Sequence, residues 1–530
     1  MGTLWYGGSI YTMKTEGDQV ESVYTEKGKI VEIGSLENLL AKYKGQIEQS
    51  HDLGGKVMYP GFVDSHLHII GHGEKLLHLD LSLITSPEQV IEILKERVQQ
   101  LEVGEWLIGE GWNENQWENP RIIHKNELDE ICPDNPMMLT RVCRHAILAN
   151  SKAINIAGID ENTEDPQGGK IVRGDNGEAT GYFLDTAQEF IKKGIPGVSE
   201  KYLTKVVKSS IDDLVKKGLV GGHSEDLNYY GGFNKTLNAF KNAIDGNKRR
   251  FRTNLLVHHE VLDDMVNEGL GYNDGTEYIE LGALKIFSDG ALGGRTAWLS
   301  EPYEDDENNY GIPIHSIEGL ETLVKKARKN EMPIAVHAIG DQAAWTIAKI
   351  IQKYPLKNGR RDRIIHAQII NENLLELLKE IDVVLDIQPT FVASDFPWII
   401  DRIGKRRIGY SYPWRTFLKH GIPCAAGSDA PIEEVNPLLG IEAAVLRKST
   451  IDGQYYNEKE QLSVYEAISL YTKGSAYAIS HEEDRGQIIP GFSADFTVLN
   501  QDLFKVSPDR IVSTEVEMTI VGEHIVYQRK

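Results

Sequence analysis

The chain has 530 residues and a formal net charge of −22, with 57 Lys and Arg against 79 Asp and Glu. A chain this acidic repels a phosphate backbone at long range, so we expect no nucleic acid partner. Hydrophobic residues make up 41% and charged residues 26%, which are the proportions of a soluble folded protein and exclude a disordered or fibrous one.

The first residues of the chain and its cysteines indicate the cellular location and the kind of metal site to expect. The first twenty residues lack a basic segment followed by an apolar one, and no later apolar run is long enough to span a bilayer. We therefore expect a cytoplasmic location and no membrane partner. The three cysteines, Cys132, Cys143 and Cys424, have no C-x-x-C spacing, which argues against a disulfide framework or a thiolate zinc site. Any metal must then be bound by His, Asp, Glu or Lys.

The two ends of the chain share one pattern. Residues 1–58 alternate apolar and polar residues around Gly-bearing turns, with a brief helix near 36–43, and residues 486–530 alternate in the same way. We predict one small β-sandwich domain formed by both ends, attached to a barrel domain at 59–485.

Eight short apolar segments run through the middle of the chain, and each ends in a polar or charged residue and precedes helix-like periodicity. This alternation is typical of a parallel βα array. Eight parallel strands close into a (β/α)8 TIM barrel, whose reactive groups lie at the C-terminal ends of the strands. The segments are GFVDSHLH (61–68), LVGGHSED (219–226), RTNLLVH (252–258), ALKIFSDG (283–290), PIAVHAIG (333–340), RIIHAQ (363–368), VVLDIQP (383–389) and PCAAGSD (423–429).

About 150 residues separate the first segment from the second, which is far more than a βα connection needs. We predict an inserted subdomain at 72–205. Its first long helix should begin at Ser86-Pro87, a pair typical of a helix N-terminus.

Histidines and an aspartate gather at the predicted strand ends. His66 and His68 are two residues apart on one strand, so both imidazoles point to one face, where they can bind a divalent metal. A histidine pair satisfied by hydrogen bonds is the alternative. His337, His366 and Asp429 end three further segments, which favours a metal site at one rim of the barrel. A purely structural role in the 427–429 turn is the alternative for Asp429.

Lys285 lies within the apolar segment 283–290. An ammonium is expensive to bury, so this side chain should lose its proton or find a partner. An uncharged amine can react with carbon dioxide to give a carbamate that bridges two metals. An outward-pointing side chain, or a pair with Asp289, is the alternative that the segment alone favours.

In combination these segments resemble the amidohydrolase superfamily, and within it amidohydrolase family 3, the metal-dependent hydrolases that include N-substituted formamide deformylase. The resemblance rests on GKVMYPGFVDSHLH, GGHSED, ALKIFSDGALGGRTA, AVHAIGDQA, RIIHAQ, GSDAP and RGQIIPGFSADFTVL. It implies a barrel with a β-sandwich made from both termini. It also implies one or two divalent metal ions, zinc being the expected one, held by His66, His68, carboxylated Lys285, His337, His366 and Asp429.

The chemistry implied by the resemblance is hydrolysis of a non-peptide carbon–nitrogen bond in an N-formyl, N-acyl or cyclic amide. Two cations about 3.5–4 Å apart would share a water, lower its pKa and polarise the substrate carbonyl. Asp429 fits the role of general base. It would take a proton from the attacking water and return this proton to the leaving nitrogen. The expected partner is a small-molecule substrate. Because symmetric association is common among enzymes, a homodimer is the expected assembly.

Four further residues are weaker substrate-contact candidates. Arg295 and Asp289 lie on a Gly-rich loop that could approach a ligand closely, although a loop salt bridge is as good an interpretation. His145 and Trp112 in the insertion could reach over the site, with His145 as an oxyanion donor. A satisfied histidine and a core tryptophan are the alternatives for this pair.

Two other functions compete. A mononuclear deaminase on the same barrel normally has a glutamate three residues after the fifth-strand histidine, but Gly340 stands there, followed by Asp341. A metal-free barrel that serves only for binding or as a scaffold should have lost metal ligands, whereas all six positions carry the expected residue types. Both observations favour the hydrolase.

Overall fold

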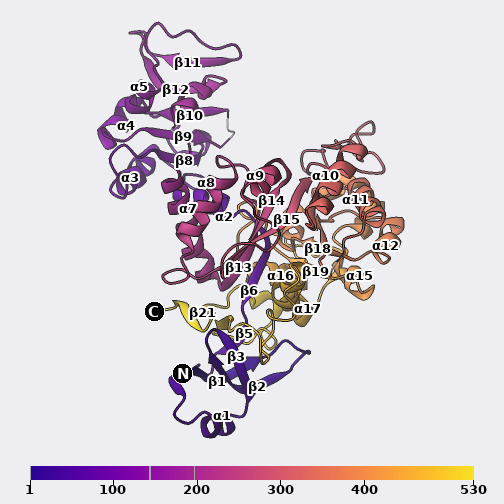
Figure 1. The fold of residues 1–530 in the computed structure, drawn as a ribbon. Helices are drawn as coiled ribbons and strands as arrows, with labels where there is room; N and C mark the ends of the chain where they lie inside the picture. Colours follow the sequence, from indigo (N-terminus) through magenta and orange to yellow (C-terminus); the bar gives the residue numbers. More distant parts are fainter. Residues whose placement is uncertain (1, 143–144, 196, 358) are drawn as a thin grey trace. The chain divides into compact units, whose positions relative to one another are not determined.

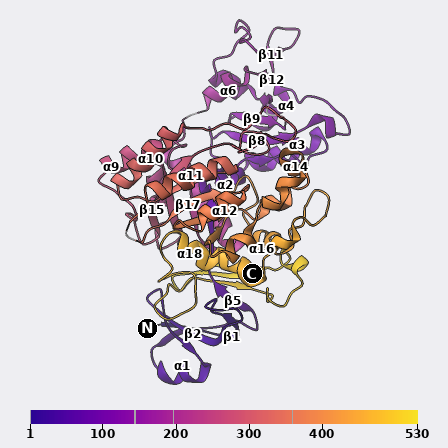
Figure 2. The same ribbon diagram turned by 90° about the vertical axis from the view of Figure 1, so that its right-hand side faces the viewer.

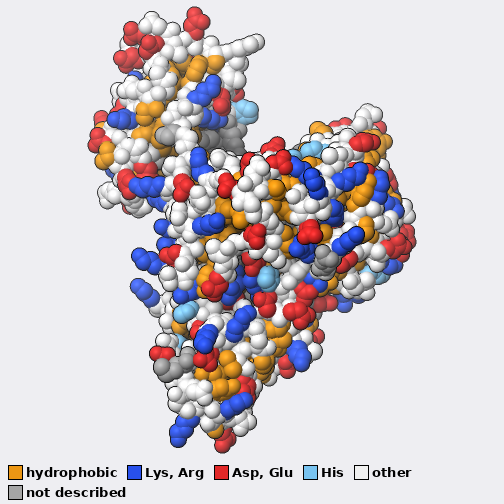
Figure 3. Space-filling view, in the orientation of Figure 1, with side chains coloured by type: hydrophobic (Ala, Val, Ile, Leu, Met, Phe, Trp, Pro, Cys, Tyr) orange, Lys and Arg blue, Asp and Glu red, His pale blue; other side chains and the backbone are white. Residues whose placement is uncertain are grey.

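The computed structural model describes residues 2–530 except 143–144, 196 and 358. The chain divides into two compact units, Met1–Gly71 with Leu203–Lys530, and His72–Tyr202. None of the described helices is both long and apolar enough to cross a membrane. On the face shown in Figure 3, acidic and basic side chains lie interspersed.

Strands from both chain ends form one eight-stranded sheet in the first unit (Figure 1). Its order is β22-β21-β20-β5-β1-β2-β3, with β4 also paired to β1. Alternate apolar residues of this sheet, including Trp5, Val23 and Phe496, pack into one core. The elements are β1 (Gly2–Tyr11), β2 (Gln19–Glu26), β3 (Lys29–Gly34), α1 (Leu36–Lys42), β4 (Ile47–Asp52), β5 (Val57–Pro60), β20 (Phe496–Leu499), β21 (Val516–Val521) and β22 (His524–Gln528).

Eight parallel strands form the second sheet of this unit in the order β6-β13-β14-β15-β16-β17-β18-β19, so the predicted (β/α)8 barrel is confirmed. Strictly apolar residues of four neighbouring strands, Leu256, Ala283, Ala335 and Ile365, form a buried cluster. The strands are β6 (Phe62–Leu67), β13 (Leu219–Ser224), β14 (Arg252–His258), β15 (Ile279–Phe287), β16 (Ile334–Ala338), β17 (Asp362–His366), β18 (Val383–Ile387) and β19 (Cys424–Ala426).

The barrel is nearly closed. Among the described residues no ladder pairs β19 with β6. The chain just beyond these strands makes the connection instead, because the Asp429 amide donates to the His66 carbonyl (2.7 Å) and the His68 amide donates to the Ala430 carbonyl (2.8 Å). The closing bonds therefore involve the predicted metal ligands themselves.

Helices cover the outside of the barrel, as α11 and α12 do in Figure 2. They form because apolar residues recur on one face, for example Ala343, Ile347 and Ile351 in α11. The helices are α7 (Glu200–Leu214), α8 (Phe233–Ala243), α9 (Leu262–Asn267), α10 (Ile317–Lys329), α11 (Asp341–Lys353), α12 (Glu372–Leu378), α13 (Thr390–Asp395), α14 (Ile399–Arg407), α15 (Trp414–Lys419), α16 (Pro437–Leu446), α17 (Val464–Ser469) and α18 (Ser475–Ala478).

The second unit contains a six-stranded sheet of order β11-β12-β10-β9-β8-β7 with helices packed on it. As predicted, a helix starts after Ser86, whose side chain accepts the Gln89 amide. The elements from the end of β6 through this unit are α2 (Ile69–Leu77), β7 (Leu79–Asp80), α3 (Pro87–Val98), β8 (Leu107–Trp112), α4 (Lys125–Ile131), β9 (Met137–Arg141), β10 (Ala146–Ala149), α5 (Ser151–Ile156), β11 (Gly169–Arg173), β12 (Ala179–Asp185) and α6 (Gln188–Gly194).

Candidate metal centre

Three of the predicted metal ligands converge at the C-terminal end of the barrel strands. His66, His366 and Asp429 each present a ligand atom, and these atoms all lie within 4.8 Å of one another. All three residues are buried. The Nδ1 atom of His66 is buried as well and has no hydrogen-bond partner among the described residues. Three strands far apart in the sequence thus bring lone-pair donors to one point.

His68 joins this cluster through Asp429. Its Nδ1 donates to the Glu225 carbonyl (2.8 Å), and its Nε2 lies 3.4 Å from Oδ1 of Asp429. Burial acts to lower the pKa of His68, but the carboxylates of Asp429, Glu225 and Asp226 together outweigh burial and raise this pKa to about 9. Burial acts to raise the pKa of Asp429, and His68, His366 and Lys285 together bring it below its ordinary value. Asp429 is therefore a carboxylate at neutral pH.

Hydrogen bonds fix the orientation of the other two histidines. His366 donates from Nδ1 to Oε1 of Gln388 (2.7 Å), which leaves Nε2 with its lone pair. His337 donates from Nε2 to the Gly290 carbonyl (3.1 Å), which leaves Nδ1 with its lone pair. The two rings lie 4.5 Å apart between centroids. Burial lowers the pKa of His366 to about 4 and that of His337 well below its ordinary value, so both imidazoles are neutral.

Backbone strain marks two of these residues. His366 has φ of +76° and Asp429 has φ of +58°, in the left-handed region that non-glycine residues seldom adopt. Each such residue costs of order 1–3 kcal/mol and persists where the surroundings fix it, as at ligand-binding sites. The strands end here in a conformation that turns both side chains toward the cluster.

Lys285 is fully buried in β15. Its Nζ has no hydrogen-bond partner within the described part of the chain and lies 4.5 Å from the Phe287 ring centroid. Burial lowers the pKa of Lys285, while the Glu225 and Asp429 carboxylates act in the opposite direction. The carboxylate oxygens of Asp289 accept hydrogen bonds from the backbone amides of Trp298, Ile339 and Gly340. Because Lys285 Nζ has no partner among the described residues, the alternative of a Lys285–Asp289 pair is wrong.

The donor set fits a divalent cation. The neutral imidazole of His366, the imidazole of His66 and the carboxylate of Asp429, buried together, are the ligand types of zinc and related metals. Among the described residues, His66 Nδ1 has no hydrogen-bond partner, and Nε2 of the same ring lies 3.5 Å from Oδ1 of Asp429. A cation bound by this nitrogen and this carboxylate would satisfy both buried groups.

The family model described as the amidohydrolase family matches residues 49–527. This chain belongs to the amidohydrolase family. It is a hydrolase that acts on carbon–nitrogen bonds. The resemblance read from its motifs is thereby confirmed.

Three relatives illustrate the range of this amidohydrolase family. The chain is 51% identical over 531 residues to YtcJ of Bacillus subtilis (strain 168), with 100% of both chains covered. It is 23% identical over 541 residues to the N-substituted formamide deformylase of Arthrobacter pascens, covering 98% of this chain and 97% of that one. A crystal structure of an uncharacterized metal-dependent hydrolase from Pyrococcus horikoshii OT3 has a TM-score of 0.78 at 28% identity, covering 96% of this chain and 99% of that one.

Two buried carboxylates that the sequence analysis did not select hold the histidine strand in place. Asp64 accepts the Ser428 amide (3.0 Å) and hydroxyl (2.6 Å), which ties β6 to the residue before Asp429. Asp386 accepts the Ser65 hydroxyl on one oxygen and the Arg363 guanidinium on the other. A polar residue within an apolar strand segment was the available signal for Asp386, as it was for Lys285.

Asp386, Arg363 and Ser65 form what we call the brace. Arg363 Nε lies 3.0 Å from Asp386 Oδ2, and Arg363 Nη2 also donates to the Ser65 carbonyl (2.5 Å). All three residues are fully buried or nearly so. The brace connects β6, which carries His66, to β17, which carries His366, and to β18, which Gln388 directly follows. It therefore spans the part of the barrel where the ladder is incomplete.

The weaker substrate-contact candidates contact other residues of the protein. Arg295 pairs with Asp305 (2.7 Å), and Trp112 is buried in the core of the second unit, where its Nε1 donates to the Leu139 carbonyl. His145 is exposed and lies 3.1 Å from Asp185. These positions favour the structural alternatives for Arg295 and Trp112. Asp289 organises the loop beside His337, with its Oδ1 3.6 Å from His337 Nε2.

Proposed function

We propose that this amidohydrolase cleaves a non-peptide carbon–nitrogen bond of an N-formyl, N-acyl or cyclic amide. The observation that carries the proposal is the convergence of His66, His366 and Asp429 within 4.8 Å at the C-terminal end of the barrel. The full-length similarity to an N-substituted formamide deformylase supports N-formyl amines as the first substrates to test.

His66, His68, His337, His366 and Asp429 would hold one or two divalent cations, with zinc as the proposed metal. When bound, such a cation acts as a Lewis acid on the substrate carbonyl and lowers the pKa of a bound water. Asp429 is the general base in this proposal. The lowered pKa of Asp429 keeps its carboxylate ionised. The carboxylate can therefore take a proton from the attacking water and return this proton to the leaving nitrogen, which gives a carboxylic acid and an amine.

Carboxylation of Lys285 belongs to the same proposal. Its buried Nζ is an amine of lowered pKa, which attacks carbon dioxide and releases one proton to give a carbamate. The carbamate oxygens would provide further metal ligands. Carboxylation would also replace an unpartnered buried amine with a group whose negative charge a bound cation can compensate.

The test is a substrate panel on protein stripped of metal and reloaded with zinc. N-formyl amines, N-acetyl amines and cyclic amides are compared under identical conditions. We expect hydrolysis in at least one class, its loss on chelation and its return with zinc. Activity that survives complete metal removal would contradict the proposal, and zinc binding without any hydrolysis would favour a binding protein.

A further inference from the structure

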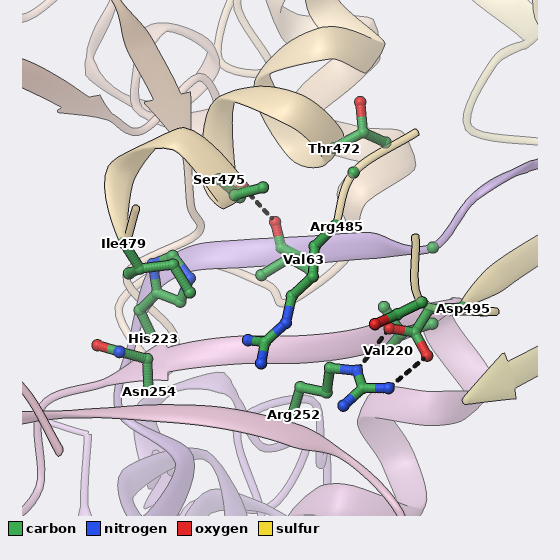
Figure 4. Close-up of a pocket in the computed structure, with 14 residues that line it drawn as sticks. Val63, Val220, His223, Arg252, Asn254, Thr472, Ser475, Ile479, Arg485 and Asp495 are labelled. Carbon is green, nitrogen blue, oxygen red and sulfur yellow. Dashed lines mark hydrogen bonds and ion pairs between the residues drawn. The ribbon is translucent and has the colours of Figure 1, made fainter. Parts of the chain in front are cut away.

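A small cavity lies toward the opposite end of the barrel. Val63, Val220 and Arg252 line it, and each is the first or second residue of its strand. The segments 472–479 and 485–495 complete the wall. The cavity volume is about 30 Å³. Figure 4 shows His223 and Asn254 next to each other on one side and the Arg485 guanidinium between the strands.

Polar atoms line this cavity without protein partners. Both ring nitrogens of His223, both amide atoms of Asn254 and Nε of Arg485 are buried and have no hydrogen-bond partner among the residues that the structure describes. His223 is 1% exposed and Asn254 is 2% exposed. An unsatisfied buried polar group costs about 1–3 kcal/mol, and such groups are rare in native proteins. Five such atoms around one cavity point to a ligand.

The charges of the wall are already compensated. Arg252 binds Asp495 through Nε (2.5 Å) and Nη2 (3.1 Å), and Nη2 of Arg485 binds Glu280 (2.6 Å). Burial lowers the pKa of His223 well below its ordinary value, so this ring is neutral. A bound anion or cation would therefore add an uncompensated buried charge.

The unpartnered atoms also require a ligand that both donates and accepts. Neutral His223 offers one N–H and one lone pair, Asn254 offers an amide oxygen and an NH2 group, and Arg485 offers an N–H. A water needs about 10–15 Å³ of such space, so the cavity accommodates about two. We propose that this cavity binds a pair of ordered waters that bridge His223, Asn254 and Arg485.

The direct test is a high-resolution crystal structure of the unchanged chain, with a second crystal soaked in bromide. We expect two water peaks within hydrogen-bond distance of the His223 and Asn254 side chains and no bromide anomalous signal there. Bromide at this place would show an anion site, and featureless density would show a dry cavity. Either result would overturn the proposal.

A double-mutant cycle tests the bridge in solution. His223→Leu and Asn254→Leu should each lower the unfolding temperature. Each substitution removes hydrogen bonds to the waters, so polar atoms of the waters and of the remaining side chain lose their partners. The double variant should lose less than the sum, since both partners are then apolar. Thr253→Val is the matched control, because its buried hydroxyl is also unpartnered in the described structure but does not line the cavity. Additive losses of His223→Leu and Asn254→Leu would contradict a shared water.

Discussion

The two ends of the barrel differ in which atoms lack partners. Toward the N-terminal end, Arg252, Arg485 and Asp362 each have an oppositely charged partner. The unpartnered atoms around the cavity belong to the neutral side chains of His223 and Asn254 and to Nε of the charge-paired Arg485. Toward the C-terminal end, the unpartnered atoms of the described residues include His66 Nδ1 and the amine of Lys285. The Asp429 carboxylate acts on this amine and lies 3.5 Å from the other ring nitrogen of His66, Nε2.

The chemical type of the unpartnered atoms therefore indicates the ligand better than the number of such atoms does. Mixed donors and acceptors in a neutral wall suit water. Lone-pair donors gathered around a carboxylate suit a cation. Each substitution proposed next alters one group, and where the chain offers one, a matched substitution elsewhere serves as its control.

Asp429→Asn should have the largest effect. The amide cannot act as a base, so we expect kcat to fall by about 10²–10⁴-fold while the fold and most of the metal remain. Steady-state kinetics with metal analysis measures both quantities. Asp495→Asn, which alters a buried carboxylate near the other end, should leave kcat close to that of the unchanged chain. A small change in kcat for Asp429→Asn would remove Asp429 as the base.

Lys285→Ala should lower both bound metal and activity, because the proposed carbamate ligand is lost. Short carboxylic acids such as acetate should restore part of the activity, since they can occupy the vacated space with a carboxylate. Lys353→Ala, at an exposed end of α11, is the control and should change neither quantity. Unchanged metal content in Lys285→Ala would end the idea of a carboxylated bridge.

The brace can be compared directly with a neighbouring ion pair, in which Asp362, the residue before Arg363 in β17, binds Arg328. Asp386 and Asp362 are both almost completely buried, and each binds an arginine. Asp386→Asn should weaken metal affinity by about 10–100-fold, as removal of groups that orient metal ligands does. Asp362→Asn should lower stability without that loss. Titration with Co²⁺, followed by its visible spectrum, measures affinity independently of any substrate. Equal affinities would show that the brace has no special role in positioning His66.

Glu280 gives the smallest effect, which appears only at acidic pH. Burial acts to raise the pKa of Glu280, but His481 and Arg485 outweigh burial and lower it from 4.5 to about 2. A carboxyl with a lowered folded-state pKa stabilises the folded chain above its unfolded pKa and loses this contribution as pH falls toward the folded value. In metal-free protein, Glu280→Gln should therefore flatten the decline of unfolding free energy between pH 4.5 and 2. Urea unfolding at several pH values measures this slope, and an unchanged slope would contradict the pairing.

Much of the barrel could be predicted from the sequence because each parallel strand is a short apolar run ending in a polar residue. His66, His68, His337, His366 and Asp429 stood at those ends, and the barrel topology brings such ends to one rim. The brace was not predictable in this way. Ser65, Arg363 and Asp386 meet across the barrel interior, and no local pattern states which strands face each other there. The alternatives for Lys285 also stayed open until its burial was known.

X-ray diffraction from crystals of zinc-loaded protein, with anomalous data at the zinc edge, tests the central claim most directly. We predict one or two zinc peaks within about 2.0–2.2 Å of nitrogen or oxygen atoms of His66, His366 and Asp429. A fully active crystal form whose anomalous map shows no metal among these three residues would contradict the account.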